Sequence, residues 1–169
     1  IGYFEDKSVM AVTASVKAYS RRGKNLLTSI QRVEYIFTLF SRKLFSMIEA
    51  VNVTPGPFSM FRREVFEKIG LFDTTNILED QEMAMRMQKH NMRIKSSMNA
   101  EVYTDVPFTF RELLKQRIRW HRGGIHNSFK YLEMISPKYG DLGVIVMPLT
   151  FIAIIMLFVV FAIVLAYIF

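Results

Sequence analysis

The sequence lacks cysteine altogether, and its 169 residues include only three histidines and one tryptophan. Without cysteine the chain forms neither disulfides nor thiolate metal sites. The histidines His90, His121 and His126 lack the spacing of zinc ligands, so we predict that they bind no metal. The P-loop, G-x-G-x-x-G and G-x-S-x-G patterns are also absent.

Charge is absent from the last part of the chain. Residues 142–169 contain no charged side chain, and a bilayer-spanning helix needs roughly 20 apolar residues. A buried helix of a soluble protein is the alternative, but such helices rarely run so long. We therefore divide the chain into a polar region, 1–140, and a membrane-spanning helix, 141–169. Pro148 is expected to kink the start of the span or mark where it enters the membrane.

The polar region is basic, with a net charge of +7 for the whole chain and a pI of about 9.7. This balance suits nucleic acid, anionic lipid or a phosphate-bearing substrate. Nucleic acid is disfavoured, because no helix-turn-helix signal or aromatic–basic interleaving is present. Lysines and arginines gather before the span, which predicts that this side is cytoplasmic. The chain begins with Ile1 and ends inside an apolar run, so we expect a fragment of a longer protein.

Strand and helix patterns alternate along residues 9–124, which predicts an α/β fold. Residues 9–19 are rich in valine and alternate in polarity, which predicts a strand. Residues 51–61 are predicted to form a short extended segment, and residues 92–106 one or two short strands. Helical spacing predicts a long amphipathic helix, or two, over 26–50, a short helix over 62–70 ending at Gly70, and a helix starting near Glu79. Thr109 and Glu112 form a capping-box pattern that opens a helix, which Gly123 and Gly124 are expected to end.

Two adjacent carboxylates, Glu79 and Asp80, stand at a predicted junction of loop and helix. They could simply cap the helix and meet its positive end. Alternatively, a carboxylate fixed there could act as a general base that takes a proton from a substrate hydroxyl. Local pattern alone leaves both interpretations open.

The stretch "VTPGPFSMFRR" at residues 53–63 contains a stiff turn with one flexible point at Gly56, before Pro57. It is either an ordinary loop or the wall of a substrate site, where glycine lets a ligand approach the backbone. Arg62 and Arg63 are expected to be solvated or paired.

"QRIRW" at residues 116–120 places Gln116, Arg119 and Trp120 on one helical face. They could form an ordinary helix surface. Alternatively, an arginine suits phosphate oxygens, and an indole gives an apolar plate on which a sugar ring can stack.

Taken in order, these motifs resemble one family. Residues 9–150 resemble the C-terminal half of processive, membrane-integrated family 2 glycosyltransferases. Cellulose, chitin, hyaluronan and poly-N-acetylglucosamine synthases are examples. The resemblance lies in the order of the motifs: the Pro-Gly loop, FRR, a short helix ending G-L-F-D, the E-D pair, T-D-V-P, Q-R-x-R-W and a membrane span. The resemblance implies that residues 1–140 are the C-terminal part of a GT-A, Rossmann-like domain.

The resemblance also implies residue roles. Asp80 corresponds to the catalytic base, with Glu79 before it, and Gln116, Arg119 and Trp120, with Arg117 among them, correspond to a motif that binds the nucleotide diphosphate and the growing sugar end. The resemblance also implies that Gly56, Pro57, Thr104 and Asp105 lie on the acceptor side of the site. Asp105 stands where the family has a glutamate.

A D-x-D motif, with which the family binds a divalent metal and the donor diphosphate, does not occur in this chain. The resemblance therefore implies that Mg²⁺ or Mn²⁺ is held by a half of the protein upstream, and that the chain alone is inactive. The implied reaction is inverting transfer of a sugar, expected from a UDP-sugar, to a growing polysaccharide or oligosaccharide at the cytoplasmic face of the cell membrane. Transfer of one sugar to a lipid carrier and a non-catalytic, membrane-anchored interaction domain are the alternatives.

Overall fold

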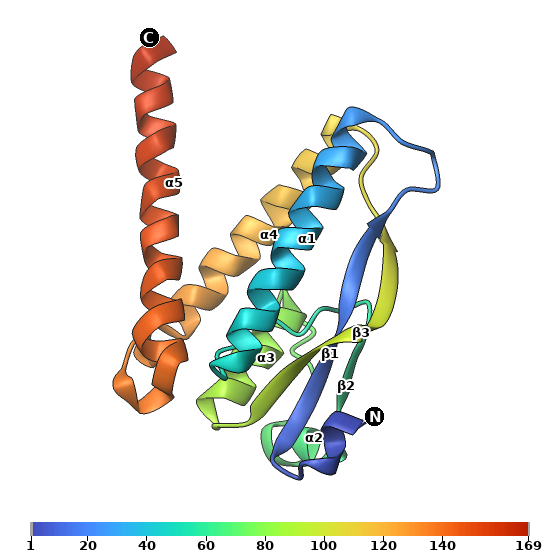
Figure 1. Cartoon of the computed structure of the whole chain (residues 1–169). Coiled ribbons are helices and arrows are strands. Elements are labelled where there is room, and N and C mark those ends of the chain that lie inside the picture. Colours follow the sequence, from blue (N-terminus) through green and yellow to red (C-terminus); the bar gives the residue numbers. More distant parts are fainter. Residues whose placement is uncertain (1, 169) are drawn as a thin grey trace.

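A three-stranded sheet forms the centre of the polar region in the computed structural model, which describes residues 2–168. Its order is β2 (Ser59–Phe61), β1 (Val9–Tyr19), β3 (Arg93–Asp105), with β2 antiparallel and β3 parallel to β1 (Figure 1). β1 has the predicted bounds. β3 is one strand of 13 residues, whose register against β1 shifts between Thr13 and Ser15. The sheet and its flanking helices confirm the α/β prediction.

Five α-helices surround or follow the sheet: α1 (Leu26–Met47), α2 (Arg63–Ile69), α3 (Glu79–Lys89), α4 (Phe110–Lys130) and α5 (Met147–Ile168). Short 3₁₀ helices lie at Gly2–Glu5 (η1), Leu132–Met134 (η2) and Pro137–Tyr139 (η3), and a π-helical turn lies at Leu142–Val146 (η4). α2 ends as predicted at Gly70, whose φ of 81° favours glycine. The capping box of Thr109 and Glu112 opens α4 with both of its hydrogen bonds.

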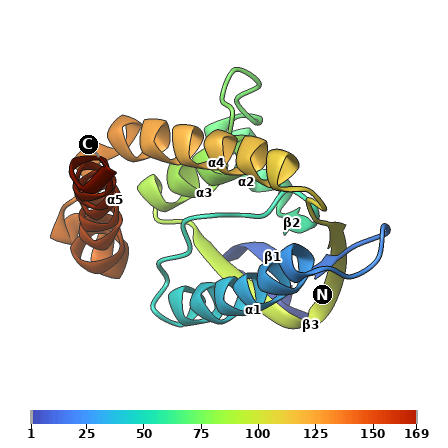
Figure 2. The same ribbon diagram turned by 90° about the horizontal axis from the view of Figure 1, so that it is seen from above.

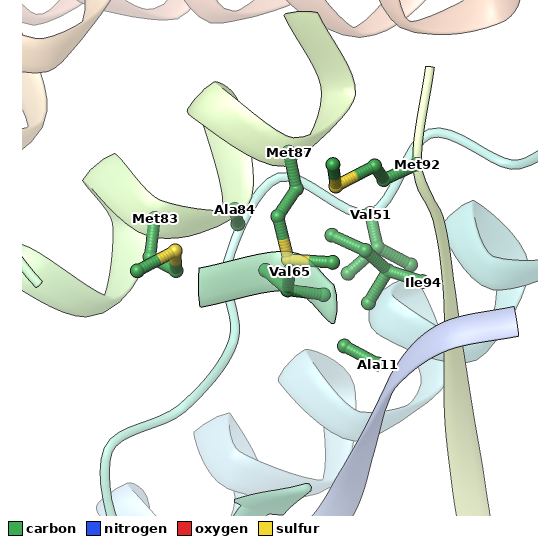
Figure 3. Close-up of a cluster of buried hydrophobic side chains, with 8 residues drawn as sticks. All are labelled: Ala11, Val51, Val65, Met83, Ala84, Met87, Met92 and Ile94. Atoms are coloured by element: carbon green, nitrogen blue, oxygen red, sulfur yellow. The ribbon is translucent and has the colours of Figure 1, made fainter. Parts of the chain in front are cut away.

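The main hydrophobic core lies where α3 packs against the sheet and α2. Met83, Ala84 and Met87 of α3 meet Val65 of α2 and Ile94 of β3, and none of the five is exposed. Figure 3 shows these side chains converging with Ala11, Val51 and Met92. Because α3 supplies a buried face of this core, its position and the position of its first turn are fixed.

A second buried cluster lies at the base of α5. It contains Ala50, Met85, Tyr131, Met134, Leu142, Val146 and Met147. Beyond it, α5 leaves the polar region (Figure 1). The helical stretch Leu142–Ile168 is long and apolar enough to cross a membrane. The π-helical turn ends at Val146, two residues before Pro148, which has no N–H and disfavours a regular helical turn before it.

α1 is a single helix whose buried face is mainly polar and whose exposed face is apolar. A surface helix normally turns its apolar stripe toward the core. The buried side chains of α1 are instead mainly polar: Thr28, Gln31, Leu39 and Ser46. Seven apolar side chains, spaced alternately four and three residues apart, are exposed on the opposite face: Leu26, Ile30, Val33, Phe37, Phe40, Leu44 and Met47. The helical periodicity was thus a correct signal of a helix, but it marks the outward face.

α4 does not end at the glycine pair, and that part of the prediction is wrong. The helix continues through Gly123 and Gly124 to Lys130. A Cβ on Gly123 would lie 2.5 Å from Cγ of Leu78, so the glycine permits close contact between α4 and the residue before α3. A Cβ on Gly124 would have no neighbour nearer than Oε1 of Gln81, at 3.8 Å.

Candidate active site

Asp80 lies in the first turn of α3, half-buried, and the 54–56 loop is bonded to it. The Thr54 hydroxyl donates to the Asp80 carbonyl oxygen at 2.8 Å, and the Thr54 N–H reaches the same oxygen at 3.4 Å. The Gly56 N–H approaches Oδ2 of Asp80 at 3.4 Å, while the Gln81 N–H donates to Oδ1 at 2.8 Å. Two regions singled out separately in the sequence are therefore in direct contact.

α4 fixes the same turn from its other side. Asn127 of α4 is fully buried, and its side-chain N–H₂ donates to the Leu78 carbonyl at 3.2 Å and to Oε1 of Gln81 at 3.1 Å. Its Oδ1 accepts a hydrogen bond from the Asn76 side chain at 2.7 Å. These bonds connect α4 to the residues on both sides of Glu79 and Asp80. Asn127 is a positioning residue that the sequence analysis missed.

A buried carboxylate also joins α3 to α4. Glu82 is only 2% exposed, and its Oε1 accepts hydrogen bonds from the Tyr131 hydroxyl at 2.7 Å and from Nζ of Lys130 at 3.1 Å. Arg86 approaches its other oxygen at 3.1 Å. Burial, followed by the bond to Glu82, raises the pKa of Tyr131. Glu82 therefore supports the site structurally, whereas Asp80 keeps its carboxylate oxygens near the surface loop.

The environment of Asp80 raises the pKa of its carboxyl above the usual value. Burial is the largest cause, and the neighbouring Glu79 charge adds to it, while hydrogen bonds from the Gln81 and Gly56 N–H groups oppose it. A carboxylate that is partly desolvated is a stronger base than a fully solvated one, and here the desolvation outweighs the hydrogen bonds. Glu79 is exposed. Between the two residues, Asp80 has the surroundings of a proton acceptor.

The Gln116–Trp120 segment lies on α4, in its middle turns. Gln116, Arg117 and Trp120 are half-buried, whereas Arg119 is exposed. Arg117 donates to Oε2 of Glu34 on α1 at 2.5 Å, and its guanidinium carbon lies 4.5 Å from the centre of the Trp120 ring. α1 and α4 lie on either side of the segment that leads into β2, as seen from above (Figure 2). Arg117 thus bridges α1 and α4, and Arg119 has no bonded partner within residues 2–168.

The remaining residues with predicted roles lie elsewhere. Thr104 and Asp105 end β3, where Oδ1 of Asp105 accepts a hydrogen bond from the Arg21 N–H at 3.2 Å. Within the described part of the chain, no hydrogen bond or ion pair joins them to Asp80 or Gly56. Pro57 is exposed in the loop beside Gly56. The structure groups Gly56 and Pro57 with Asp80, but it places Thr104 and Asp105 at the turn before α1.

No set of three metal-ligating carboxylate or imidazole groups converges anywhere in residues 2–168. These residues therefore do not fit a divalent metal by themselves. A hollow of about 440 Å³ lies near the ends of α1 and α3, lined by residues that include Glu49, Arg93 and Tyr139. Asp80 does not line it, so the hollow does not coincide with the candidate base.

Comparison with known proteins places these features in one family. Residues 4–169 match the model of the glycosyl transferase family group 2. A poly-beta-1,6-N-acetyl-D-glucosamine synthase of Staphylococcus aureus strain COL is 31% identical over 120 residues, which are 70% of this chain and 29% of that protein. A protein of the same name from Staphylococcus epidermidis is 30% identical over 105 residues, 62% of this chain and 26% of that protein.

The matched segments show that the chain spans less than a third of the length of these curated relatives. The family match itself covers nearly the whole chain, including the Asp80 turn, the Gln116–Trp120 segment and the apolar helix. The chain belongs to the glycosyl transferase family group 2.

Proposed function

We propose that this chain is the acceptor-side part of a membrane enzyme that transfers a sugar from a nucleotide-sugar donor to a growing polysaccharide, with inversion at the anomeric carbon. The family match and the synthase relatives support a polysaccharide synthase. The names of those relatives make N-acetylglucosamine the first sugar to test, with UDP as the expected nucleotide.

The observation that carries the proposal is the placement of Asp80. It combines a raised pKa with hydrogen bonds that fix both carboxylate oxygens and the backbone around them. Asp80 is the proposed general base, which removes the proton from an acceptor hydroxyl while that oxygen attacks the donor's anomeric carbon. That oxygen attacks the anomeric carbon on the side opposite the departing diphosphate, and this single displacement leads to inversion.

The Gln116–Trp120 segment supplies the other proposed contacts. Arg119 is exposed, so its guanidinium is free to bind the diphosphate as negative charge develops on it. Trp120 offers an aromatic face for the acceptor sugar, and Arg117 holds that ring through its own contact with it. A divalent metal on the donor diphosphate would need ligands from outside residues 2–168.

The proposed location is the cytoplasmic face of the cell membrane, with α5 in the bilayer. α5 is apolar along its length, and the segment before it carries Lys130 and Lys138 among other basic residues. Positive charge next to a span favours the cytoplasmic side. Protection of an epitope tag placed in the turn at Gly23, measured in sealed inside-out and right-side-out vesicles, tests this orientation.

Replacement of Asp80 tests the proposed base. In the full-length protein, Asp80→Asn should lower sugar transfer from UDP-N-acetylglucosamine by on the order of 10²–10⁴-fold, because the amide cannot accept the proton. Donor affinity, measured by titration of radiolabelled UDP-sugar, should remain nearly unchanged. The matched control is Asp141→Asn, which changes an exposed carboxylate at the start of η4.

Near-normal turnover in Asp80→Asn would refute the assignment of the base. Product analysis separates the remaining alternatives. A long polymer supports the synthase, a single sugar on a lipid supports a carrier transferase, and donor binding without any product supports a non-catalytic domain.

A further inference from the structure

Glu34 is the only acidic residue of α1, and it makes a contact that joins α1 to α4. Its Oε2 accepts a hydrogen bond from Nη2 of Arg117 at 2.5 Å, although the two residues are 83 positions apart in the sequence. α4 carries three further arginines, Arg111, Arg119 and Arg122. Within residues 2–168, none of these three makes a side-chain hydrogen bond or ion pair. Glu34 therefore engages one arginine of a helix that offers four.

The same guanidinium lies over the Trp120 ring. Its carbon atom is 4.5 Å from the ring centre, which is within the range of a cation–π contact. Arg117 and Trp120 are three residues apart and share a face of α4, but a long arginine side chain can adopt many rotamers. The bond to Glu34 fixes the far end of that side chain and so keeps the guanidinium over the ring. Glu34, Arg117 and Trp120 thus form a chain of contacts that runs from α1 to the indole.

The clearest consequence of this chain is geometric. The Glu34 side chain is 44% exposed and that of Arg117 is 21% exposed, and an ion pair that reaches solvent contributes only modestly to stability. Its effect on the indole is more specific. An indole ring has two faces, and Arg117 lies over one of them. A ligand that stacks on Trp120 is therefore limited to the opposite face.

The contacts of Arg117 also separate acceptor from donor. The positive charge of Arg117 is already matched by Glu34, whereas Arg119 is exposed and has no bonded partner within residues 2–168. A diphosphate is better met by the unmatched charge. Because the chain of contacts from Glu34 ends at Trp120, the ring proposed to stack on the acceptor, its effect should fall on the acceptor sugar and not on the donor.

Building on the proposed function, we propose that Glu34 is a positioning residue for the acceptor sugar: it anchors Arg117, which holds the Trp120 ring in place and leaves the opposite face for the terminal sugar. Glu34 touches neither donor nor acceptor and exchanges no proton. It acts only through Trp120. α1 thereby takes part in acceptor binding, although its own side chains need not contact the sugar.

The test uses the full-length protein in membrane vesicles, with UDP-N-acetylglucosamine as donor and β-1,6-linked N-acetylglucosamine oligosaccharides of defined length as acceptor. Glu34→Gln removes the carboxylate charge and should raise the KM for the oligosaccharide by about 2- to 10-fold, the range expected from an aromatic contact. The KM for the donor and kcat at saturating oligosaccharide should stay within twofold, with a modest fall in melting temperature. Glu34→Asp, which keeps the charge on a shorter side chain, should recover part of the affinity. The matched control Glu67→Gln, which breaks the exposed Arg63–Glu67 ion pair on α2, should leave both KM values unchanged.

A double-mutant cycle with Trp120→Ala separates this role from a structural one. Trp120→Ala alone should raise the oligosaccharide KM at least as much as Glu34→Gln does. If Glu34 acts only through the ring, Glu34→Gln should add nothing in the Trp120→Ala background, whereas a structural role predicts effects that add. Oligosaccharide binding without turnover, followed by calorimetry on the detergent-solubilised protein, gives the same comparison where transfer by Trp120→Ala is slow.

An unchanged oligosaccharide KM in Glu34→Gln would overturn the inference, even if the melting temperature falls. A rise of equal size in the wild-type and Trp120→Ala backgrounds would overturn it as well. A raised donor KM with a normal oligosaccharide KM would place Glu34 on the diphosphate side and would also contradict it. A wild-type protein that transfers no sugar refutes the proposed function itself, and the inference with it. An active wild type with an unaffected Glu34→Gln variant refutes the inference alone.

Discussion

The two parts of the candidate site differ in how completely this chain builds them. The Asp80 turn is held by the 54–56 loop on one side and by Asn127 of α4 on the other, and its carboxylate oxygens both accept backbone hydrogen bonds. Within residues 2–168, the one side-chain hydrogen bond from the Gln116–Trp120 segment is that of Arg117 to Glu34, while Arg119 is exposed. The contrast fits the proposed roles: the proposed base, Asp80, is oriented before substrate binds, whereas the proposed phosphate-binding Arg119 gains its partner only when the donor diphosphate binds.

Among the substitutions that test this contrast, the largest loss of sugar transfer is expected from replacing Arg119. Arg119→Ala in the full-length protein should reduce kcat for sugar transfer by on the order of 10²–10³-fold, as for other groups that stabilise developing charge. Its melting temperature should remain that of the wild type, because the side chain is exposed. Diphosphate release and thermal unfolding measure the two quantities. Arg117→Ala gives the matched comparison, and we expect it to lower the melting temperature because it removes the bridge to Glu34.

A smaller effect is expected where α4 meets the residue before α3. Gly123→Ala places a methyl group 2.5 Å from Cγ of Leu78, so Leu78 and the adjacent Asp80 turn must shift. Overpacking of this kind costs about 1–3 kcal/mol of stability, and we expect roughly a tenfold loss of kcat from the displaced base. Gly124→Ala is the control, since its nearest neighbour would lie at 3.8 Å. Equal effects of the two substitutions would contradict the packing role of Gly123.

The smallest expected effect is a shift in the pH dependence of sugar transfer. Transfer should fall on the acid side as Asp80 becomes protonated, at a pH set by its raised pKa. The charged group that raises it is Glu79 of its own helix. Glu79→Gln removes a negative charge, so the Asp80 pKa should fall and activity should persist to lower pH. The pH dependence of kcat/KM measures this shift. A move to higher pH would mean that another group controls the acid side.

Much of the local structure follows from short-range signals in the sequence. Val9–Tyr19 has the Val-rich alternation of a strand, Gly70 ends α2, and the Thr109–Glu112 capping box opens α4. Each depends on neighbours within a few residues, which a sequence displays directly. The E-D pair could be placed at a helix start for the same reason. Its role as a base rested on family resemblance, and it stays a proposal.

Other features depend on contacts between distant residues. Gly123 looks like a helix terminator until Leu78 is seen packed against it. Asn127 bonds to residues about 50 positions earlier, and no local pattern marks it. The buried polar face of α1 is a further example. Thr28, Gln31 and Ser46 are buried there, whereas the polar face of an amphipathic helix is ordinarily the solvated one.

The exposed apolar stripe of α1 has a practical consequence for purification. Removing α5 would take away the segment that could cross a membrane, yet the seven side chains from Leu26 to Met47 would still face outward. A continuous apolar surface of that kind drives association in water. A shortened protein designed for work without detergent therefore needs polar replacements along α1, at positions such as Phe37 and Phe40, as well as a stop before Leu142.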